Sequence, residues 1–377
     1  MLTGGACAHY ANIGHVTYAT TSSKSDLTST SMQASVLHVD GSLTVESREI
    51  PTPAPDEVLV RVAAVGVCGS DTHYLRHGRI GDHVVTGPIV LGHEASGRVV
   101  AVGSAVGGDR IGERVSIEPQ TPDPTSRESR RGDYNLCPSM RFYGTPPIDG
   151  ALAEFVTIGA SFAHPVPEHV SDEAAALMEP LSVAIASIRK AGVGMGESIL
   201  ITGAGPIGLL CAQVARAAGL TRIIVVEPGV QRRSAALRFG ATEVAVSVAD
   251  SDAGQTAVDA FVDASGAPPA VLDGISAVRP GGRVVLVGMG ADTMELPVSL
   301  IQNRELVLTG VFRYANTWPT AIELVATGKV DLDDLVTSHH GIADVRAGLD
   351  ADRIPSSIKA VVHPGIDTVE PAARPSS

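Results

Sequence analysis

The stretch Ser198-Ile199-Leu200-Ile201-Thr202-Gly203-Ala204-Gly205-Pro206-Ile207-Gly208 decides the fold of this chain. Its first five residues predict a short buried strand, and its glycines predict a tight turn into a helix that runs to about Gly219. A glycine pattern alone is weak, because glycine-rich turns are common. Here Glu227 also follows the next predicted strand, Arg222 to Val226, about 20 residues beyond the last glycine. The combination predicts a dinucleotide-binding unit.

The glycines and the acid have separate tasks in such a unit. The glycines let the pyrophosphate of the cofactor approach backbone amides at the start of the helix. Glu227 can accept hydrogen bonds from both hydroxyls of the adenosine ribose and would repel a 2′-phosphate, which favours NAD over NADP. Arg232 and Arg233 follow closely, and an arginine there can also pair with a phosphate. The sequence therefore favours NAD without excluding NADP.

Strands and helices alternate downstream of this unit. Helices are predicted at Gln231 to Phe239 and at Pro269 to Val278. Further strands are predicted at Val244 to Val248, Ala260 to Asp263, Arg283 to Val287 and Leu306 to Gly310. Such alternation builds a parallel, doubly wound sheet, so we expect an α/β fold here.

The chain before residue 198 has short β-type runs separated by turn residues. The predicted strands are Val36 to Val39, Leu43 to Ser47, Glu57 to Val67, Ser96 to Val102, Arg114 to Ile117 and Ala153 to Ile158. They indicate a barrel-like, β-rich domain. Glu118 to Gly150 is predicted as a long loop, which inside a domain is usually functional or mobile. A helix is predicted from Ser171 to Lys190, with a break or kink at Pro180 that would make it a hinge between domains.

Three residues of the β-rich half have side chains that bind metals. Cys68 lies in Gly66-Val67-Cys68-Gly69-Ser70, and His93 and Glu94 lie in Leu91-Gly92-His93-Glu94-Ala95. Sulfur, nitrogen and oxygen ligands with one open coordination position suit a catalytic zinc. A single cysteine or histidine is more often a packing residue, so the pattern alone leaves both interpretations open. The neighbouring glycines favour the metal, since they let the backbone bend toward one ion.

Composition narrows the possible partners. The formal net charge of −13 argues against nucleic acid and anionic membranes, and no apolar run approaches the length of a bilayer span. The cysteines Cys7, Cys68, Cys137 and Cys211 lie far apart, which suits a reducing compartment, and we expect a cytoplasmic protein.

Residues 1–31 match neither a signal peptide nor a transit peptide and are expected to form a disordered tail.

A zinc segment followed by a dinucleotide-binding unit resembles the zinc-dependent medium-chain dehydrogenases, and within them the sorbitol (L-iditol 2-) dehydrogenases. The similarity extends from about Gln33 to Pro364. The segments that carry it are Val67 to Tyr74, Arg79 to Gly81, Val90 to Gly97, Tyr134 to Pro138, Phe142 to Gly150, Met178 to Val183, Gly203 to Gly208 and Gly310 to Pro319. The resemblance implies a GroES-like catalytic domain at 32–180 and 314–364, a Rossmann cofactor domain at 181–313, and a C-terminal tail at 365–377.

The resemblance also implies roles for individual residues. Cys68, His93 and Glu94 would hold the catalytic zinc, and Glu179 would orient its water or take its place. The residues expected to line the polyol site are Tyr74, Glu179, Arg313 and Tyr314. The residues expected to contact NAD are Gly203, Gly205, Ile207, Gly208, Glu227, Arg232, Val287, Gly288, Met289, Val311, Phe312 and Arg313. We expect the proton to leave by way of Ser70 and the water held by Glu179, with His73 as a weaker candidate.

One departure from the family pattern concerns a second, structural zinc. Relatives that hold it carry four cysteines in a CxxCxxCx7C lobe. The corresponding residues here are Asp123, Ser126, Ser129 and Cys137, which cannot form a closed thiolate cage. We therefore expect one zinc per chain. The departure casts doubt on the rigidity of the lobe and on the assembly more than on the chemistry. The family is usually dimeric or tetrameric, so we expect a homodimer or homotetramer.

The expected activity is oxidation of a secondary hydroxyl of a polyol of the sorbitol, xylitol or L-iditol type to the ketose, with hydride transfer to NAD. One alternative is another zinc alcohol dehydrogenase, acting on threonine, butanediol or an aldonate. Gly310 to Pro319 and Thr145-Pro146-Pro147 favour polyols over these. The other alternative is a metal-free NAD-binding sensor or structural subunit. The presence of all three metal-ligand residues argues against it.

Overall fold

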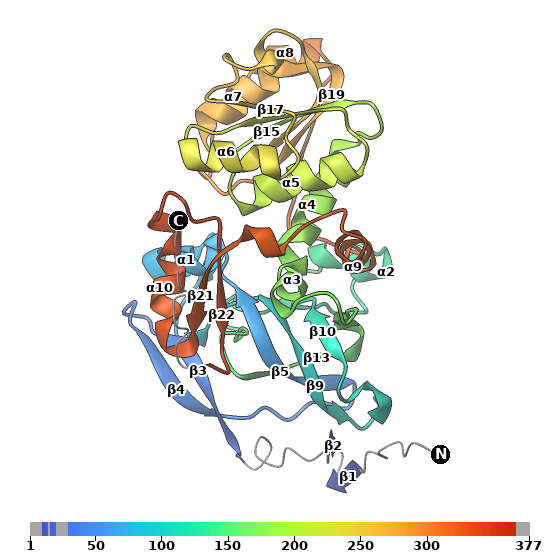
Figure 1. Cartoon of the computed structure of the whole chain (residues 1–377), viewed down its shortest axis with the longest axis vertical. Coiled ribbons are helices and arrows are strands. Elements are labelled where there is room, and N and C mark those ends of the chain that lie inside the picture. The colour runs from blue at the N-terminus through green and yellow to red at the C-terminus, as the bar shows by residue number, and fades with distance from the viewer. Residues whose placement is uncertain (1–9, 14–15, 20–28, 367–377) are drawn as a thin grey trace, which may run out of the picture.

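The computed structural model describes residues 10–13, 16–19 and 29–366. Within these ranges an α/β part lies above a β-rich part in Figure 1, with helix α4 (Met178–Ala191) between them. The fold class expected from the sequence, a β-rich GroES-like domain with a parallel-sheet cofactor domain, is confirmed. The predicted domain limits at residues 180 and 313 fall inside α4 and just after the last strand of the parallel sheet.

The α/β part contains a six-stranded parallel sheet in the order β17-β16-β15-β18-β19-β20. Its strands are β15 (Ser198–Thr202), β16 (Arg222–Val226), β17 (Glu243–Ala245), β18 (Val258–Asp263), β19 (Val278–Leu286) and β20 (Val307–Gly310). Its helices are α5 (Pro206–Ala217), α6 (Val230–Arg238), α7 (Pro268–Ala277) and α8 (Val298–Asn303). The strand order reverses direction on either side of β15, and ligands of such sheets bind in the crevice at that point.

The glycine turn after β15 has the geometry that its sequence predicts. Gly203 has a φ of +92°, a left-handed conformation that favours glycine. A Cβ atom on Gly208 would lie 1.9 Å from the carbonyl oxygen of Gly203, so any side chain there would force helix α5 away from the strand. Pro206 occupies the first turn of α5, where its missing N–H costs no hydrogen bond. The turn therefore brings the start of α5 close to the carboxyl end of β15.

The β-rich part is built on a nine-stranded sheet and a three-stranded sheet. The larger sheet contains β1 (Tyr10–Ile13), β2 (Val16–Ala19), β5 (Glu57–Gly66), β9 (Glu94–Gly103), β10 (Arg114–Ile117), β13 (Phe155–Gly159), β14 (Ala163–Pro165), β21 (Val336–Gly341) and β22 (Lys359–His363). The smaller sheet contains β3 (Ser31–Leu37), β4 (Leu43–Glu49) and β8 (Ile89–Val90). Strand β22 pairs with β5, Val361 opposite Gly66, so the end of the described chain returns to the first domain.

The remaining elements of the β-rich part are short. The long loop predicted from Glu118 to Gly150 contains the paired strands β11 (Gln120–Thr121) and β12 (Arg141–Phe142) and helix α2 (Arg127–Arg130). The small pair β6 (Arg79–Ile80) and β7 (His83–Val84) follows helix α1 (Gly69–His77). Helices α9 (Trp318–Ala326) and α10 (Val345–Leu349) lie in the returning segment.

The N-terminal segment differs from the expected disordered tail at two places. Tyr10–Ile13 and Val16–Ala19 form an antiparallel pair, and β2 extends the sheet at β9 with Val16 opposite Gly103. The prediction of a disordered tail is wrong for these two segments. Both contain β-branched or aromatic residues, which favour strands and which the Ser- and Thr-rich average of the region concealed. The rest of residues 1–28 and the C-terminal residues 367–377 lie outside the described chain.

The helix predicted from Ser171 to Lys190 is divided, but not at Pro180. It forms α3 (Asp172–Ala176) and α4, which are separated at Leu177. Pro180 lies in the first turn of α4, where a backbone N–H has no partner within the helix, so proline is tolerated there. The helix is interrupted as predicted, but the interruption is at Leu177 and Pro180 does not cause it.

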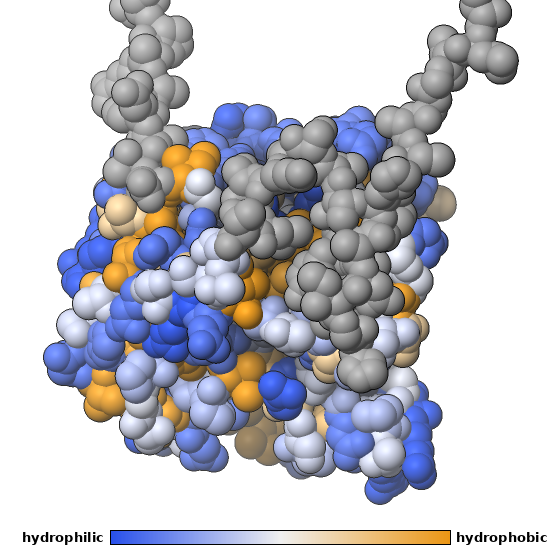
Figure 2. All heavy atoms as spheres, turned by 90° about the horizontal axis from the view of Figure 1, so that it is seen from below, coloured by the Kyte–Doolittle hydropathy of each residue, from blue (hydrophilic) through white to orange (hydrophobic). Residues whose placement is uncertain are grey.

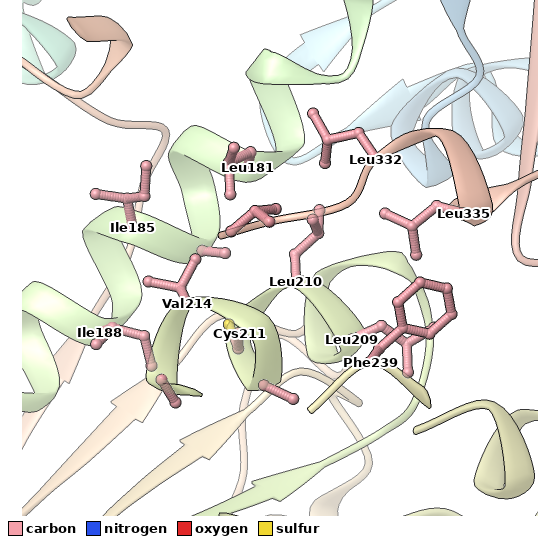
Figure 3. Packing of buried hydrophobic residues seen from close by; sticks show 14 of the residues in the cluster. Leu181, Ile185, Ile188, Leu209, Leu210, Cys211, Val214, Phe239, Leu332 and Leu335 are labelled. Atoms are coloured by element: carbon pink, nitrogen blue, oxygen red, sulfur yellow. The ribbon is translucent and has the colours of Figure 1, made fainter. Parts of the chain in front are cut away.

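The hydrophobic core around α4 and α5 connects the two parts of the molecule. Figure 3 shows Leu181, Ile185 and Ile188 of α4 beside Leu210 and Val214 of α5. Leu332 and Leu335, from the segment that returns to the first domain, pack against the same cluster (Figure 3). Cofactor domain, connecting helix and returning segment therefore share one core.

The far end of the β-rich part has a mixed surface. Seen from below, hydrophobic side chains reach this face in small groups among hydrophilic ones (Figure 2). Within the described ranges, no helix combines the length and the apolar character required to cross a bilayer.

Candidate metal centre and cofactor cleft

Cys68, His93 and Glu94 come together although their segments lie on different elements. Cys68 is the N-cap of α1, and Glu94 is the first residue of β9, opposite Gly66 of β5. Their ligand atoms all lie within 4.8 Å of one another. The bend that lets neighbouring residues 93 and 94 face one ion occurs at Gly92, which has a φ of +88° and whose added Cβ would lie 2.9 Å from Leu152.

Asp71 connects the two segments of this cluster. Its carboxylate accepts hydrogen bonds from the backbone N–H of Cys68 and of Gly92, both at 3.0 Å. Its Oδ1 atom also lies 3.5 Å from Nδ1 of His93. A carboxylate on one ring nitrogen fixes the histidine tautomer, which leaves Nε2 of His93 for a metal. Asp71 therefore orients the backbone of Cys68 and the ring of His93 together.

Glu94 is paired with a buried lysine on one side only. Lys359 of β22 donates to Oε1 of Glu94 at 2.6 Å and to the carbonyl oxygen of Val67 at 2.7 Å. Burial would lower the pKa of Lys359, but the charges of Glu94 and Cys68 outweigh it and hold that pKa above its ordinary value. Oε2 of Glu94 is buried and has no hydrogen-bond partner among the described residues. Such an orphaned oxygen is costly, and a cation held by Cys68 and His93 would satisfy it, so these residues fit a zinc ion.

Glu179 lies beside this cluster with a different partner. It occupies the first turn of α4, and its Oε1 accepts a hydrogen bond of 2.7 Å from the hydroxyl of Tyr314. Burial raises the pKa of Glu179 to about 7. Within the described chain, the ligand-atom cluster that contains Glu94 does not include Glu179. The geometry thus gives the two glutamates different surroundings.

Arg313 and Tyr74 lie near His93. The guanidinium carbon of Arg313 is 3.9 Å from the centre of the Phe142 ring, and that ring is 5.4 Å from the ring of His93. Arg313 has a φ of +54°, an uncommon conformation for a residue with a side chain. Burial raises the pKa of the Tyr74 hydroxyl, against the opposing charges of Arg313 and His93. Arg313 and Tyr74 therefore both lie in the surroundings of His93.

A cleft of about 340 Å³ joins the cluster to the glycine turn. It is lined by residues of both parts, which include Cys68, Glu94, Pro180, Gly205, Pro206, Ile207, Arg232, Val287, Gly288, Met289 and Lys359. A neighbouring hollow is lined by Gly203, Glu227, Arg232 and residues of the loops after β16 and β18. The two hollows share Gly205 and Arg232, so together they form one path from the metal cluster to Glu227.

Glu227 is fixed at the end of this path. Its Oε2 accepts from the backbone N–H of Ala204 at 2.9 Å, and its Oε1 accepts from that of Gly229 at 2.8 Å. Arg233 donates hydrogen bonds to the carbonyl oxygens of Glu227 and Pro228, so its guanidinium is held against the backbone of this loop. Arg232 is the arginine that faces the hollow.

Comparison with known proteins gives the family. The model of the alcohol dehydrogenase GroES-like domain matches residues 54–168, and that of the zinc-binding dehydrogenases matches residues 206–327. Sorbitol dehydrogenase of Bos taurus is 42% identical over 312 residues, which cover 80% of this chain and 87% of that protein. The chain belongs to the zinc-dependent medium-chain dehydrogenases.

Two further comparisons agree. A protein of Aspergillus clavatus named "Probable D-xylulose reductase A" is 44% identical over 306 residues, which cover 78% of this dehydrogenase and 85% of that protein. A structure from E. coli CFT073, described as a short chain alcohol dehydrogenase in complex with NADH, superposes with a TM-score of 0.84 at 26% identity. It covers 89% of this dehydrogenase and 100% of its own chain. The family expected from the sequence is confirmed.

Several predicted site residues are not part of the cleft lining. Ser70 is half-buried in α1, and Val311 packs against the core cluster of α4 and α5. Phe312 is 55% exposed, and its carbonyl oxygen accepts a hydrogen bond from Asn135 of the lobe. In the described structure, the predicted residues that line neither hollow are Ser70, Tyr74, His93, Glu179, Gly208, Val311, Phe312, Arg313 and Tyr314.

Three residues of the site are not predicted from the sequence. Asp71 had a local signal, since an acid at the third position of a helix can accept from the backbone N–H of the N-cap residue. Phe142 had a weaker local signal, because it begins the segment Phe142 to Gly150 that carries the family resemblance. Lys359 had none, because 265 residues separate it from Glu94. Only the pairing of β22 with β5 brings it to the site.

The four positions of the family's structural-zinc lobe also lie together. The backbone N–H of Asp123 donates to Sγ of Cys137 at 3.3 Å. The hydroxyl of Ser126 donates to that of Ser129 at 2.8 Å. Hydrogen bonds therefore connect these residues where relatives with that zinc have four thiolates.

Proposed function

We propose that this dehydrogenase oxidises a secondary hydroxyl of a polyol of the sorbitol, xylitol or L-iditol type to the ketose, with NAD as hydride acceptor. The observation that carries the proposal is the single cleft that contains Cys68 and Glu94 together with Gly205 and Ile207 of the glycine turn. A metal-binding cluster and a dinucleotide turn in one cleft allow a hydroxyl carbon to meet a nicotinamide. Relatives named for sorbitol and D-xylulose support the substrate class.

The protein's own residues prepare the site. Zinc held by Cys68, His93 and Glu94 would lower the pKa of a substrate hydroxyl, and NAD would accept the hydride. Lys359 fixes one oxygen of Glu94 and leaves the other for the ion. Tyr314 fixes one oxygen of Glu179, so the second oxygen can hold a water or a substrate hydroxyl. Glu179 and Ser70 are the proposed route for the proton.

Arg313 is the proposed determinant of which carbon reacts. Its guanidinium offers several donors in a fixed plane, and stacking on Phe142 restrains it beside His93. A polyol presents many hydroxyls, so a restrained donor array with Tyr74 can select one orientation. The same array gives a second candidate function, oxidation of an aldonate, because Arg313 can also bind a carboxylate with two hydrogen bonds.

Initial rates with NAD over a substrate panel test the function. The panel contains sorbitol, xylitol, L-iditol, ribitol, galactitol, L-idonate, threonine and 2,3-butanediol. We expect the highest kcat/KM with a polyol and at least about a tenfold loss of that preference in Arg313→Lys, whose ammonium lacks the planar fork. A kcat/KM that is highest for L-idonate would favour the second candidate. Absence of turnover with every substrate by the zinc-loaded protein would leave the NAD-binding subunit as the alternative.

We also propose a cytoplasmic homodimer or homotetramer. Cys68, Cys137 and Cys211 are unpaired in the described chain, which suits a reducing compartment. Light scattering of the purified protein tests the assembly, and a monomer at micromolar concentration would contradict it.

A further inference from the structure

A second group of metal-ligand side chains lies outside the cleft. Glu173 of α3, His339 of β21 and His363 of β22 have ligand atoms that all lie within 4.8 Å of one another. Oε1 of Glu173 lies 2.7 Å from Nδ1 of His339 and 2.9 Å from Nε2 of His363. The two rings are nearly parallel, with centres 6.1 Å apart. One carboxylate oxygen thus faces a nitrogen atom from each ring.

Paired strands and a helix hold the three residues. In the parallel ladder of β21 and β22, His339 is opposite Val361 and Gly341 is opposite His363. Residues two apart on a strand point to the same face, so the two histidines are diagonal neighbours on one face. Glu173 approaches that face from α3, whose N-cap Ser171 accepts a hydrogen bond from Ala174. The arrangement is therefore set by regular structure.

The surroundings of His363 direct a lone pair into the group. Nδ1 of His363 lies 3.0 Å from the carbonyl oxygen of Ala63, and a carbonyl oxygen only accepts, so Nδ1 carries a proton. In the neutral ring Nε2 then presents a lone pair to Oε1 of Glu173, which has only lone pairs as well. A proton or a cation must lie between them. A histidine that donates its other N–H to a backbone carbonyl is the usual arrangement of a metal ligand.

We propose that Glu173, His339 and His363 form a second, exchangeable site for zinc or a similar divalent transition metal. Two imidazoles and one carboxylate suit such metals, whereas calcium and magnesium prefer oxygen ligands alone. The side chains of His339, Glu173 and His363 are 46%, 21% and 20% exposed, so an ion can enter and water can complete its coordination. Tetrahedral zinc, with bonds of about 2.0 Å, separates its ligand atoms by about 3.3 Å. The two oxygen–nitrogen distances would have to lengthen by about 0.4 to 0.6 Å to match this. The two nitrogen atoms lie within 4.8 Å of each other.

An ion at this site would join the two segments that lead into the catalytic cluster. Glu173 lies on α3, directly before the helix that carries Glu179. His363 is on β22, the strand that carries Lys359. Occupancy would therefore hold α3 against β22 and stabilise the catalytic domain, without adding a ligand to the cleft.

Zinc titration of the protein with its catalytic zinc in place tests the proposal. Binding of Zn²⁺ is measured by competition with a chromophoric chelator, together with the thermal midpoint with and without added Zn²⁺. The variants are His339→Asn and Glu173→Gln. The control is His340→Asn, because His340 is the next residue on β21, points to the opposite face and contacts Ser338.

We expect a second equivalent of zinc in the unmodified protein and in the control, with a rise in thermal midpoint. Both site variants should weaken this second equivalent by at least about 10- to 100-fold and lose the rise. Their turnover without added zinc should equal that of the unmodified protein, since neither residue is among those that line the cleft in the described structure. Absence of a second equivalent from the unmodified protein would overturn the proposal. So would its retention at full affinity in His339→Asn. Either result would leave the proposed polyol activity untouched.

Discussion

Each proposed zinc ligand is held by a supporting residue. The carboxylate of Asp71 holds the backbone of Cys68 and lies beside the ring of His93. Lys359 holds Glu94, and Tyr314 holds the neighbouring Glu179. Such partners restrain the ligands before an ion arrives, which is how supporting residues raise metal affinity. The two glutamates, although close, should therefore respond differently to the same substitution.

Glu94→Gln should lose zinc and Glu179→Gln should keep it. Glu94 supplies the orphaned oxygen of the ligand cluster, whereas Glu179 stands outside that cluster and bonds to Tyr314. We expect Glu94→Gln to retain little zinc after dialysis, and Glu179→Gln to retain a full equivalent while turnover falls by about 10- to 100-fold. Zinc content and kcat of both variants check this. Zinc lost only from Glu179→Gln would mean that the ligand is assigned to the wrong glutamate.

A double variant separates metal loss from charge imbalance. Glu94→Gln leaves the ammonium of Lys359 buried without its counter-charge, and breaking such a buried pair costs about 3 to 5 kcal/mol. Adding Lys359→Met removes that charge. We expect the double variant to recover much of the lost thermal stability but none of the zinc. Recovery of zinc would show that Glu94 is not a ligand.

Glu227 should determine the choice of cofactor. Removal of its carboxylate in Glu227→Ser removes the acceptor for ribose hydroxyls and the repulsion of a 2′-phosphate, while Arg232 stays in the hollow. The ratio of kcat/KM for NAD to that for NADP should fall by about 10- to 100-fold. Asp273→Ser, which removes another acid from the same hollow, is the control and should leave the ratio unchanged. A preference for NADP in the unmodified enzyme would contradict this reading of Glu227.

The sequence predicted the site residues that local motifs carry and missed those that only the fold brings in. Cys68, His93 and Glu94 stand beside glycines in short motifs, and they form one cluster in the structure. Glu227 follows a strand at a spacing that is typical of its role. Lys359 stands in an ordinary strand with no motif around it, and its contact with Glu94 depends on the pairing of β22 with β5. Sequence spacing cannot show such a contact.

Elements were predicted best where burial and propensity agree. β15 and β16 are almost fully buried and rich in Ile and Val, and their predicted limits match the observed ones. β19 is longer than predicted because it begins at Val278 and passes through Pro280 and two glycines, residues that usually mark a turn. Pairing with the neighbouring strands of the parallel sheet, and not local propensity, sets where such a strand begins.

The lobe should be held by its hydrogen bonds and not by a metal. Cys137 accepts from the backbone of Asp123, and Ser126 donates to Ser129. Cys137→Ser keeps a polar atom there, so we expect thermal stability to change by no more than about 1 kcal/mol. Tightly held zinc should stay at one equivalent per chain in both forms, counted after dialysis against a weak chelator that empties exchangeable sites. Loss of a tightly held zinc on this substitution would contradict the expectation.

At the scale of the whole molecule, the N-terminal strands are peripheral to the chemistry. Every residue that lines the cleft lies at or after Val67, and β2 pairs with β9 over three residues only. A chain that starts at Met32 should keep its kcat and KM. Its thermal midpoint should fall by a few degrees at most, because a short edge ladder contributes about 1 kcal/mol. Steady-state kinetics and a melting curve of the shortened chain check this. A large loss of activity would show that the segment supports the catalytic domain.

The position of β22 between β5 and β21 has a consequence for biosynthesis. A ribosome adds about 5 to 20 residues per second, so the 265 residues between Glu94 and Lys359 take roughly 13 to 50 seconds to make. The parallel sheet, which ends at Gly310, can fold during that time, but the larger sheet of the β-rich part still lacks the strand that pairs with β5 and carries Lys359. Zinc capture should therefore be among the last events in maturation. A messenger with a stop codon before residue 359 would direct a chain that contains Cys68, His93 and Glu94 and yet retains no tightly bound zinc.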